Sequence, residues 1–560
     1  MRKVILLLAL SVCFFNVKAI KPSKVKPVKN IILLISDGTS VTTMSTARWL
    51  QYYNNSAEPK LNLDPYLCGT VKTFNSDAPI GDSAPTTSCY MTGHASQAGY
   101  VSTVPPSVGM NDLDEVDTTR TYAPMATLLE AGKQLKGKAT GLVVTCYYTH
   151  ATPADCAAHY YDRGNSEVIS NQMVYNNLDV VIGGGNACLT KEQENYLKNN
   201  GWSVLHDDLN GMRTNKNNKM WCLYGAYEMS YEIDRKPAEQ PSLAEMTRTA
   251  INKLSKNKNG FFLMVEGSQV DWAAHANDIT ALPTEFLAFD KACGEALDFA
   301  RKDGNTLVII TCDHSNSGFS MGTKRRSDYG HATKEQVIGP LAKYKMSAGA
   351  LCNKLNSLPY DSLTSVFEDA TGIKLNKEEF TCIVNAKDYK SSPIPEDMRT
   401  VNRSLEMSSS NLETVIKNIC RLHTFFDFTT GGHTGEDVFL AAYHPKATLP
   451  MGMNTNKELA HYMQAAFGLY GKIDNFTHTI YAPHTDVFGN GYECNIVETE
   501  NKKFPNLEVK NIKNGKTITI KSFTNIVIAN GKEHHTASIM TYVDKTGKFY
   551  VPKNLVDYLK

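Results

Sequence analysis

Residues 261–275 read Phe-Phe-Leu-Met-Val-Glu-Gly-Ser-Gln-Val-Asp-Trp-Ala-Ala-His. The first five form an unbroken apolar run, which is typical of a strand buried on both faces of a parallel sheet. Glu266 is expected where that strand ends. Asp271 and His275 follow four residues apart, so they would project from one face of the next helix. Ligands of open α/β sheets bind at the carboxyl ends of the strands, so these side chains predict half of a metal centre there.

Three further segments supply acidic or imidazole side chains, and two of them do so where a strand is expected to end. Asp37 ends one apolar run, and Asp313 with His314 ends another. His433 lies among glycines, which would let the backbone approach a crowded centre closely. Each signal is modest alone, because a strand-end Asp is often only the cap of the next helix. Together they predict the other half of the metal centre.

A serine precedes a predicted helix in the segment Gly81-Asp82-Ser83-Ala84-Pro85-Thr86-Thr87-Ser88. Pro85 fits the first turn of that helix, with Ser83 just ahead of it. The unpaired N–H groups and positive dipole of a helix start suit an anionic phosphate. Ser83 is therefore either a nucleophile or a simple N-cap, and Thr86, Thr87 and Ser88 are rival hydroxyls.

A predicted strand at residues 142–145 is followed by His150 and by a helix start, with Thr152 at the cap and Pro153 behind it. Arg163 would then lie about three turns along that helix, at 3.6 residues per turn. A lone arginine is usually a solvated surface group. One aimed at a bound phosphate would instead hold it with a planar two-pronged fork.

Composition and the N-terminus narrow the class of protein. The 560 residues carry 58 Lys and Arg against 57 acidic residues, so no global positive charge favours nucleic acid. Residues 1–19 have the charged, apolar and small-residue parts of a secretory signal peptide, so export to the periplasm or the extracellular space is expected. Cys13 as a lipid-anchored cysteine is a weaker interpretation. No segment reaches the roughly 18 apolar residues of a transmembrane helix.

Twelve cysteines remain after the predicted signal peptide. None forms a Cys-x-x-Cys pair, which makes a thiolate zinc site unexpected. Export permits disulfides, and a mixture of buried thiols with one or two bridges is expected, but their pairing does not follow from the sequence.

The overall pattern predicts an α/β fold with a large, mostly parallel central sheet, helices on both faces, a helical insertion and a small C-terminal β appendage. Polar residues 189–241 are expected to form an irregular excursion. The predicted parts are a core in 20–338 and 429–474, a helical insert in 339–428, and a β-rich appendage in 475–560. Within the insert we expect helices at 347–358, 360–370 and 411–426, and a polar linker at 391–407.

In order and context, these motifs resemble the alkaline phosphatase family. The pieces are Ser-Asp-Gly after a strand, Asp-Ser-Ala, Ala-Thr-Pro followed by an arginine, Glu-Gly before Asp-x-x-x-His, Asp-His, and His-Thr-Gly-Glu-Asp. They span residues 30 to about 443, which is most of the chain. The resemblance implies hydrolysis of phosphate monoesters, small-molecule substrates, and an open possibility of a homodimer.

The resemblance also implies roles for the candidate residues. It makes Asp271, His275 and His433 ligands of one zinc, and Asp37, Asp313 and His314, with Ser83, the shell of a second. It makes Asp37, Thr152 and Glu266 ligands of magnesium. Ser83 would be the nucleophile that forms a phosphoserine, and Arg163 would hold the phosphoryl oxygens.

Two positions depart from the family pattern. His150 stands where some members have an Asp that supports the magnesium through water, so the identity of the third metal is open. Trp272 stands where many relatives have Lys or His near the phosphate. Losing that donor is expected to weaken phosphate binding.

Three alternative functions share part of this pattern. A phosphodiesterase of the same superfamily shares the two-zinc core but usually lacks the Glu266 and Thr152 set. A sulfatase would need an arginine in the nucleophile segment that Ser83-Ala84-Pro85-Thr86-Thr87 does not supply. A non-catalytic phosphate- or metal-binding relative is disfavoured, since no expected ligand is missing.

Overall fold

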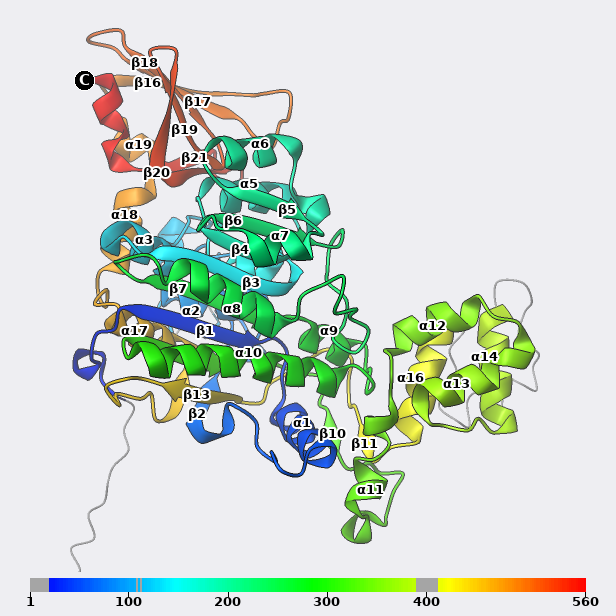
Figure 1. Cartoon of the computed structure of the whole chain (residues 1–560). Helices are drawn as coiled ribbons and strands as arrows, with labels where there is room; N and C mark the ends of the chain where they lie inside the picture. The colour runs from blue at the N-terminus through cyan, green and yellow to red at the C-terminus, as the bar shows by residue number, and fades with distance from the viewer. Residues whose placement is uncertain (1–19, 107–108, 111–112, 389–410) are drawn as a thin grey trace, which may run out of the picture.

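The computed structural model describes residues 20–106, 109–110, 113–388 and 411–560. A ten-stranded sheet runs through the molecule in the order β14-β2-β13-β8-β1-β7-β3-β4-β6-β5 (Figure 1). All neighbouring strands pair in parallel except β13, which is antiparallel to β2 and β8. The predicted signal peptide lies outside the described residues, so export stays a prediction.

The strands of this sheet are mostly short apolar runs. They are β1 Asn30–Ser36, β2 Leu67–Lys72, β3 Ala139–Tyr147, β4 Val180–Gly184, β5 Ser203–His206, β6 Met220–Tyr224, β7 Phe261–Gly267, β8 Thr306–Thr311, β13 Val438–Tyr443 and β14 Gly452–Thr455. Every residue of β1, β7 and β8 is buried, as expected for central strands covered on both faces. The predicted fold class is confirmed.

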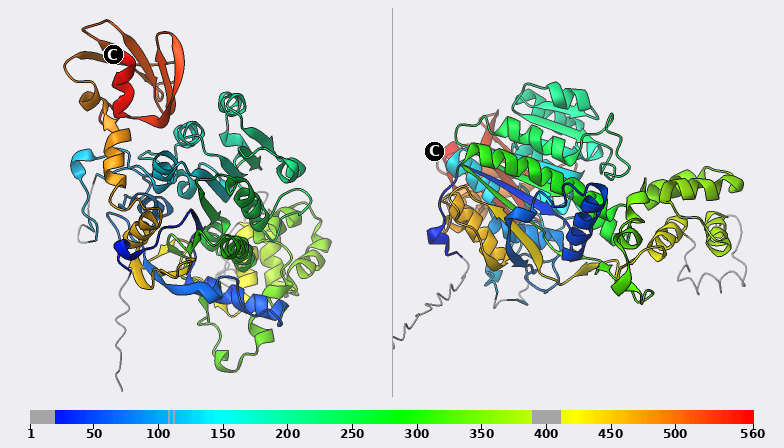
Figure 2. Two further views of the ribbon diagram at one scale, coloured as in Figure 1. Left: turned by 60° about the vertical axis from the view of Figure 1, so that its left-hand side comes forward. Right: turned by 60° about the horizontal axis from the view of Figure 1, so that its bottom comes forward.

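Helices cover both faces of the sheet (Figures 1 and 2). One layer contains α1 (Val41–Asn54), α8 (Leu243–Leu254) and α10 (Leu282–Asp303), and the other contains α2 (Ser83–Thr92), α3 (Leu128–Lys136) and α17 (Asn456–Ala466). The 22 residues of α10 begin with a proline in the first turn and end at Gly304 with φ 67°. The two helix layers hold the sheet between them, and with it the edge at which the strands end.

The expectation of an irregular excursion at residues 189–241 is wrong. This range contains α6 (Lys191–Asn199), α7 (Leu209–Thr214) and the strands β5 and β6, which extend the central sheet. All five residues of β6 are buried, whereas α6 places most of its polar side chains outward. The segment is polar on average because it forms the edge of the sheet. Its short apolar runs were therefore not recognised as strands.

Four α-helices lie in the described part of the range expected for the insert. They are α12 (Ala348–Asn356), α13 (Leu363–Thr371), α14 (Lys377–Asp388) and α16 (Leu412–Leu422). Their apolar faces share a core that continues onto residues next to the candidate site, including Val270 and Ala274. Helix α14 was not predicted from the sequence. The predicted linker 391–407 lies outside the described residues, and the insert boundaries stay predictions.

A second sheet of seven strands follows helix α18 (Ile473–Ile480), which contains the predicted boundary at residue 475. Its strands are β15 Ala482–Pro483, β16 Tyr492–Val497, β17 Asn506–Asn511, β18 Thr517–Lys521, β19 Thr524–Ala529, β20 Lys532–Val543 and β21 Lys548–Val551. It is antiparallel throughout (Figure 2). It also has its own apolar core. Among the described residues, no helix combines the length and the apolar character needed to cross a bilayer.

The expectation of one or two disulfide bridges is wrong for the cysteines that the structure describes, since they are free thiols. Cys89, Cys156, Cys293 and Cys312, for example, are buried free thiols. They behave as small apolar core residues.

Candidate metal centre

The candidate site lies where four adjacent parallel strands end. Asp313 follows β8, Asp37 follows β1, Glu266 is the last residue but one of β7, and Thr152 follows β3. The register pairs Ile35 with Glu266 on one side and with Thr311 on the other. Extending the pairing of β1 with β8 by two residues brings Asp37 level with Asp313. The parallel sheet therefore gathers side chains that are hundreds of residues apart.

The first cluster consists of Asp37, Asp313 and His314 around one imidazole nitrogen. His314 Nε2 lies 3.4 Å from Asp37 Oδ1 and 3.5 Å from Asp313 Oδ2. Ser83 Oγ lies 3.2 Å from the same nitrogen. Two ligands of one tetrahedral zinc ion, each about 2.1 Å from it, lie roughly 3.3–3.4 Å apart. The spacing of this cluster therefore suits a shared cation.

Several buried oxygen atoms of this cluster have no hydrogen-bond partner. Both carboxylate oxygens of Asp37 and Oδ2 of Asp313 are unpaired, and both residues are fully buried. The other oxygen of Asp313 accepts backbone N–H groups from Gly38 and His314, at 3.2 and 3.0 Å. Buried oxygens without partners are costly. A cation between them would satisfy them, so the residues fit a metal on chemical grounds.

The second cluster consists of Asp271, His275 and His433. His275 Nε2 lies 3.3 Å from Asp271 Oδ2 and 3.1 Å from His433 Nε2. The Nδ1 atoms of the two histidines instead contact backbone carbonyls, His275 at Gly431 (2.7 Å) and His433 at Gly81 (2.8 Å). Donation from Nδ1 leaves a lone pair on each Nε2, which is the arrangement of metal-ligating histidines.

Short local structures bring these ligands together. Asp271 and His275 lie on α9 (Gln269–His275), as predicted. His433 lies on β12 (His433–Thr434), which pairs with β9 (Ser315–Asn316) directly after His314. The rings of His433 and His314 stack with centroids 3.7 Å apart. The short pairing of β12 with β9 therefore holds the two clusters next to each other.

Two residues next to Asp271 support its position, and neither was assigned a role from the sequence. Asn316 Nδ2 donates to Asp271 Oδ1 at 2.6 Å, which leaves Oδ2 for the cluster. Gly38 has φ +59°, and a Cβ there would lie 2.1 Å from Asp271 Oδ1. A glycine is needed at position 38 on both grounds, since any side chain would displace the carboxylate.

The third cluster consists of Cys146, His150 and Glu266, with Thr152 beside it. Glu266 Oε1, Thr152 Oγ1 and His150 Nδ1 are buried atoms without a hydrogen-bond partner. The sequence predicted His150, Thr152 and Glu266 in one place but not Cys146. The signal that was available is its position in β3, two residues beyond Val144, which pairs with Glu266.

The pKa shifts show how unfavourable this concentration of carboxylates is without cations. Burial, followed by repulsion from Asp313, raises the pKa of Asp37 well above its usual range. Burial raises the pKa of Glu266 to about 7. Burial also opposes ionisation of Asp271, but its hydrogen bond with His275 and the charges of the nearby histidines together outweigh this and lower the pKa of Asp271. Bound cations would reverse these costs, because they stabilise the deprotonated ligands.

We expect removal of the cations to lower the melting temperature by an amount that grows from about pH 6.5 to pH 9. The hydrogen bond with Asp271 raises the pKa of His275 to about 9. In the cation-free protein, protonated His275 therefore stabilises the folded state below the usual pKa of about 6.5. This stability is lost as the pH rises to about 9. The pKa of Glu266 is also raised, so its contribution to the stability of the folded state is likewise lost as the pH rises to about 7.

Cation binding requires deprotonated ligands, so metal affinity increases over the same pH range. The measurement is thermal unfolding of chelator-treated and of zinc- and magnesium-restored protein at several pH values. A gap between the two melting temperatures that stayed constant or shrank towards pH 9 would contradict this assignment of ligands.

Ser83 is the first residue of α2, and the N-cap is Asp82. Its hydroxyl therefore lies at the helix start and points to His314 rather than acting as the cap. The rival hydroxyls are placed differently: Thr86 Oγ1 bonds to Asp82 O at 2.8 Å along its own helix. Ser88 Oγ donates to Asp155, and Thr87 Oγ1 is buried without a partner.

The predicted position of Arg163 on a helix is wrong. Helix α4 (Ala151–Ala154) ends after four residues, and Arg163 lies in the loop before α5 (Ser166–Tyr175). The chain leaves the helix because Tyr160 makes two backbone hydrogen bonds with Val101, at 2.8 and 3.0 Å. Such long-range pairing overrides local helix preference.

The loop nevertheless brings Arg163 to the candidate site. Its Nη1 donates to Asp82 Oδ1 at 2.6 Å, and its Nη2 lies 3.3 Å from His150 Nε2. Asp82 adjoins Ser83, so this ion pair fixes the guanidinium next to the serine hydroxyl. Burial and the Arg163 charge lower the pKa of His150 to about 3, which keeps that imidazole neutral and able to bind a metal.

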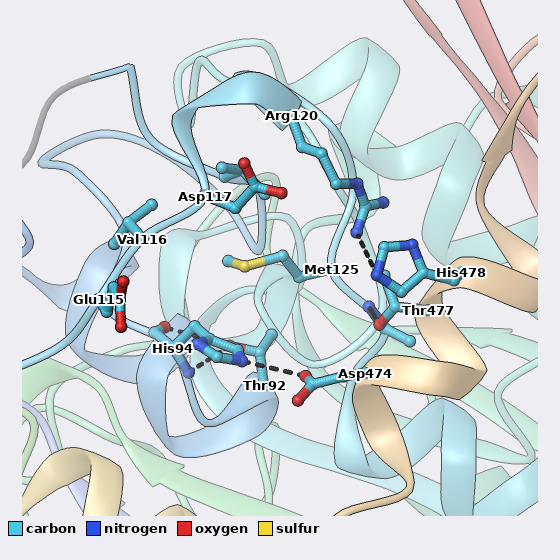
Figure 3. Close-up of a pocket in the computed structure, with 12 residues that line it drawn as sticks. Thr92, His94, Glu115, Val116, Asp117, Arg120, Met125, Asp474, Thr477 and His478 are labelled. Atoms are coloured by element: carbon cyan, nitrogen blue, oxygen red, sulfur yellow. Dashed lines mark hydrogen bonds and ion pairs between the residues drawn. The ribbon is translucent and has the colours of Figure 1, made fainter.

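A separate pocket is lined by residues of the segment 92–126 and of α18 (Figure 3). His94 Nε2 lies 3.0 Å from Asp474 Oδ1, and Arg120 Nη1 lies 3.5 Å from His478 Nε2. None of the residues that line it belongs to the three clusters. The pocket therefore lies apart from the candidate metal centre.

Comparison with known proteins decides the family. A family model described as alkaline phosphatase matches residues 28–469, which include all three clusters. This chain belongs to the alkaline phosphatase family. The assignment makes it a metal-dependent enzyme of phosphate-monoester hydrolysis. The matched range ends before the C-terminal sheet.

Individual relatives agree with this family assignment. Alkaline phosphatase 3 of Bacillus subtilis is 34% identical over 447 residues, which cover 77% of this chain and 87% of the relative. The human tissue-nonspecific alkaline phosphatase is 29% identical over 341 residues, which cover 51% of this chain and 63% of the relative.

Solved structures agree on the fold. The cold-active alkaline phosphatase of the psychrophile Shewanella sp. superposes with a TM-score of 0.66 at 24% identity, over 78% of this chain and 99% of the other. A variant of the alkaline phosphatase from the Antarctic bacterium TAB5, solved with magnesium in its M3 site, superposes with a TM-score of 0.52 at 25% identity, over 80% and 99%.

Proposed function

We propose that this chain hydrolyses phosphate monoesters through a phosphoserine formed on Ser83, at a centre of two zinc ions and one magnesium ion. The observation that carries the proposal is the Ser83 hydroxyl, 3.2 Å from His314 Nε2 and beside carboxylates that lack hydrogen-bond partners. A hydroxyl in that position is a natural nucleophile, because a cation held there would favour its deprotonated form.

Each cluster receives one cation in this proposal. Asp271, His275 and His433 would hold one zinc, and Asp37, Asp313 and His314, with Ser83, would hold the other. Glu266, Thr152 and Asp37, with His150 nearby, would hold magnesium. When bound, such cations neutralise phosphate charge and lower the pKa of an adjacent hydroxyl.

The protein's own groups would carry out the positioning. Ser83 Oγ attacks the phosphorus in line with the departing alcohol oxygen. Serine gives up its proton as the new bond forms, and the alcohol oxygen takes up a proton as the old bond breaks, so the products are phosphoserine and free alcohol. The Arg163 guanidinium, held by Asp82, faces the two non-bridging oxygens with a planar fork. Water then replaces Ser83 on phosphorus and releases inorganic phosphate. A good leaving group is not required, so broad acceptance of monoesters is expected.

The competing activity is hydrolysis of phosphate diesters. The test strips the protein of metal, restores zinc and magnesium, and compares turnover of a phosphate monoester with that of a diester of the same alcohol. The proposal predicts a large preference for the monoester in the restored protein. Rapid diester turnover with negligible monoester turnover would assign the chain to the phosphodiesterases instead.

We expect the substitution Trp272→Lys to tighten inhibition by inorganic phosphate about tenfold, since a hydrogen bond to a charged group contributes ~1.5 kcal/mol or more. The Trp272 ring lies 5.7 Å from the His150 ring, and His150 contacts Arg163. An ammonium group in this place would therefore be close to the phosphate held by Arg163. The measurement is the inhibition constant of phosphate in monoester turnover.

The matched control is Trp49→Lys, which adds the same charge at an exposed tryptophan of α1. It should leave phosphate inhibition unchanged. Equal inhibition of the wild-type protein and of Trp272→Lys would show that Trp272 does not adjoin the bound phosphate.

A further inference from the structure

The third cluster contains a sulfur atom that the family resemblance did not lead us to expect. Cys146 Sγ lies 3.5 Å from Glu266 Oε2. One ligand atom from each of Cys146, His150 and Glu266 falls within 4.8 Å of the others. Of the candidate metal clusters in the described part of the chain, this is the one that includes a cysteine.

The strand geometry directs this sulfur to the site. Val144 pairs with Glu266 across β3 and β7, and side chains two residues apart on a strand share a face. β3 shifts its register against β4 between Val143 and Tyr147, and Cys146 Sγ lies 3.5 Å from Glu266 Oε2, so the sulfur reaches the Glu266 side of the sheet. Cys146 is fully buried.

The spacing agrees with shared coordination. A zinc ion with sulfur at about 2.3 Å and a carboxylate oxygen at about 2.1 Å, in tetrahedral geometry, separates those two ligands by roughly 3.6 Å. The observed distance is 3.5 Å. Glu266 and Thr152 are buried and each presents an oxygen atom without a hydrogen-bond partner. These unpaired atoms are an independent sign that the cluster receives a ligand.

We infer that Cys146 is a ligand of the third cation and makes this site select zinc over magnesium. Magnesium prefers a shell of oxygen atoms and waters, whereas sulfur and imidazole favour zinc. Binding would form a sulfur–metal bond at the expense of the S–H bond, and the thiol proton would pass to solvent. The inference rests on the metal centre proposed above, and it changes the identity of one of its ions.

The test uses full-length protein loaded with three equivalents of cobalt(II) in place of zinc. Thiolate coordination gives a sulfur-to-cobalt charge-transfer band in the near ultraviolet. The wild-type protein should show this band, and Cys146→Ser should lack it. The control Cys156→Ser removes another buried thiol, which contacts Thr152 O at 3.6 Å, and should keep the band.

Metal content gives a second measurement. After dialysis against equal zinc and magnesium, the wild-type protein should retain three zinc ions per chain, and Cys146→Ser two zinc ions and one magnesium ion. If that variant does not fold, zinc X-ray absorption of the wild-type protein replaces it, with a sulfur scatterer expected at about 2.3 Å.

The inference is overturned if fully cobalt-loaded wild-type protein shows no such band, or if the band survives in Cys146→Ser. Cys146 would then only donate its thiol hydrogen to Glu266. These readouts do not depend on turnover. A protein that has the band but no monoesterase activity would refute the proposed function and leave the Cys146 ligand intact.

Discussion

Replacement of Ser83 by alanine should abolish labelling of the protein by a phosphate monoester carrying radioactive phosphorus. It should also lower kcat by about 10³-fold or more, as expected when a nucleophile is removed. The hydroxyl lies 3.2 Å from His314 Nε2 at the first residue of α2, and no other hydroxyl of that helix takes this position. The measurement is acid-stable label on the protein, together with turnover.

The matched control is Thr86→Val on the same helix. Thr86 directs its hydroxyl to Asp82 O within the helix, so its loss should leave labelling intact. Persistent labelling of Ser83→Ala would transfer the nucleophile to a rival, and Thr87, whose buried hydroxyl has no partner, would be the first to test.

Replacement of Asp37 by asparagine should remove at least one cation per chain and lower kcat by about 10³-fold, equivalent to about 4 kcal/mol of transition-state stabilisation. Asp37 has two unpaired, buried oxygens at the junction of the first and third clusters. An amide of the same shape supplies one neutral oxygen in place of a charged pair. Metal content by mass spectrometry and turnover with excess zinc measure the two effects.

The control for Asp37 is another buried carboxylate. Asp290 on α10 accepts backbone N–H groups from Asn62 and Leu63, at 2.9 and 3.1 Å. Asp290→Asn should lower the melting temperature but keep the full metal content. Full metal content in Asp37→Asn would remove Asp37 from the ligand set.

The candidate clusters could be predicted because the positions of their residues follow from the hydrophobic pattern. Asp37, Glu266 and Asp313 each come at the end of an apolar run, and the carboxyl ends of parallel strands share one edge. The helical spacing of Asp271 and His275 fixed their common face. These signals are local, so they survive without knowledge of the tertiary structure.

Other parts of the site depend on contacts between distant residues. Arg163 reaches the site because Tyr160 pairs with Val101, and nothing near position 163 encodes that pairing. The carbonyl acceptor of His433 Nδ1 is Gly81, which is 352 residues away in the chain. Cys146 could not be predicted from the sequence, because Cys-x-x-Cys spacing does not identify a single cysteine that lies close to candidate ligands from other segments.

The strands at the edge of the central sheet were not predicted for a different reason. Strands β5 and β6 are short, and the segment around them is polar because much of it faces solvent. Averaged over fifty residues, such a segment resembles a loop. Helix α14 was missed for a similar reason, since only one side of it is buried.

Anomalous diffraction at the zinc edge, from crystals of zinc-loaded protein, tests the central claim most directly. The account predicts one strong peak among Asp271, His275 and His433, and a second among Asp37, Asp313 and His314, each about 2.0–2.2 Å from its ligands. Ser83 Oγ should lie next to the second peak. Crystals of active, zinc-containing protein with no peak within coordinating distance of these six residues would contradict the account.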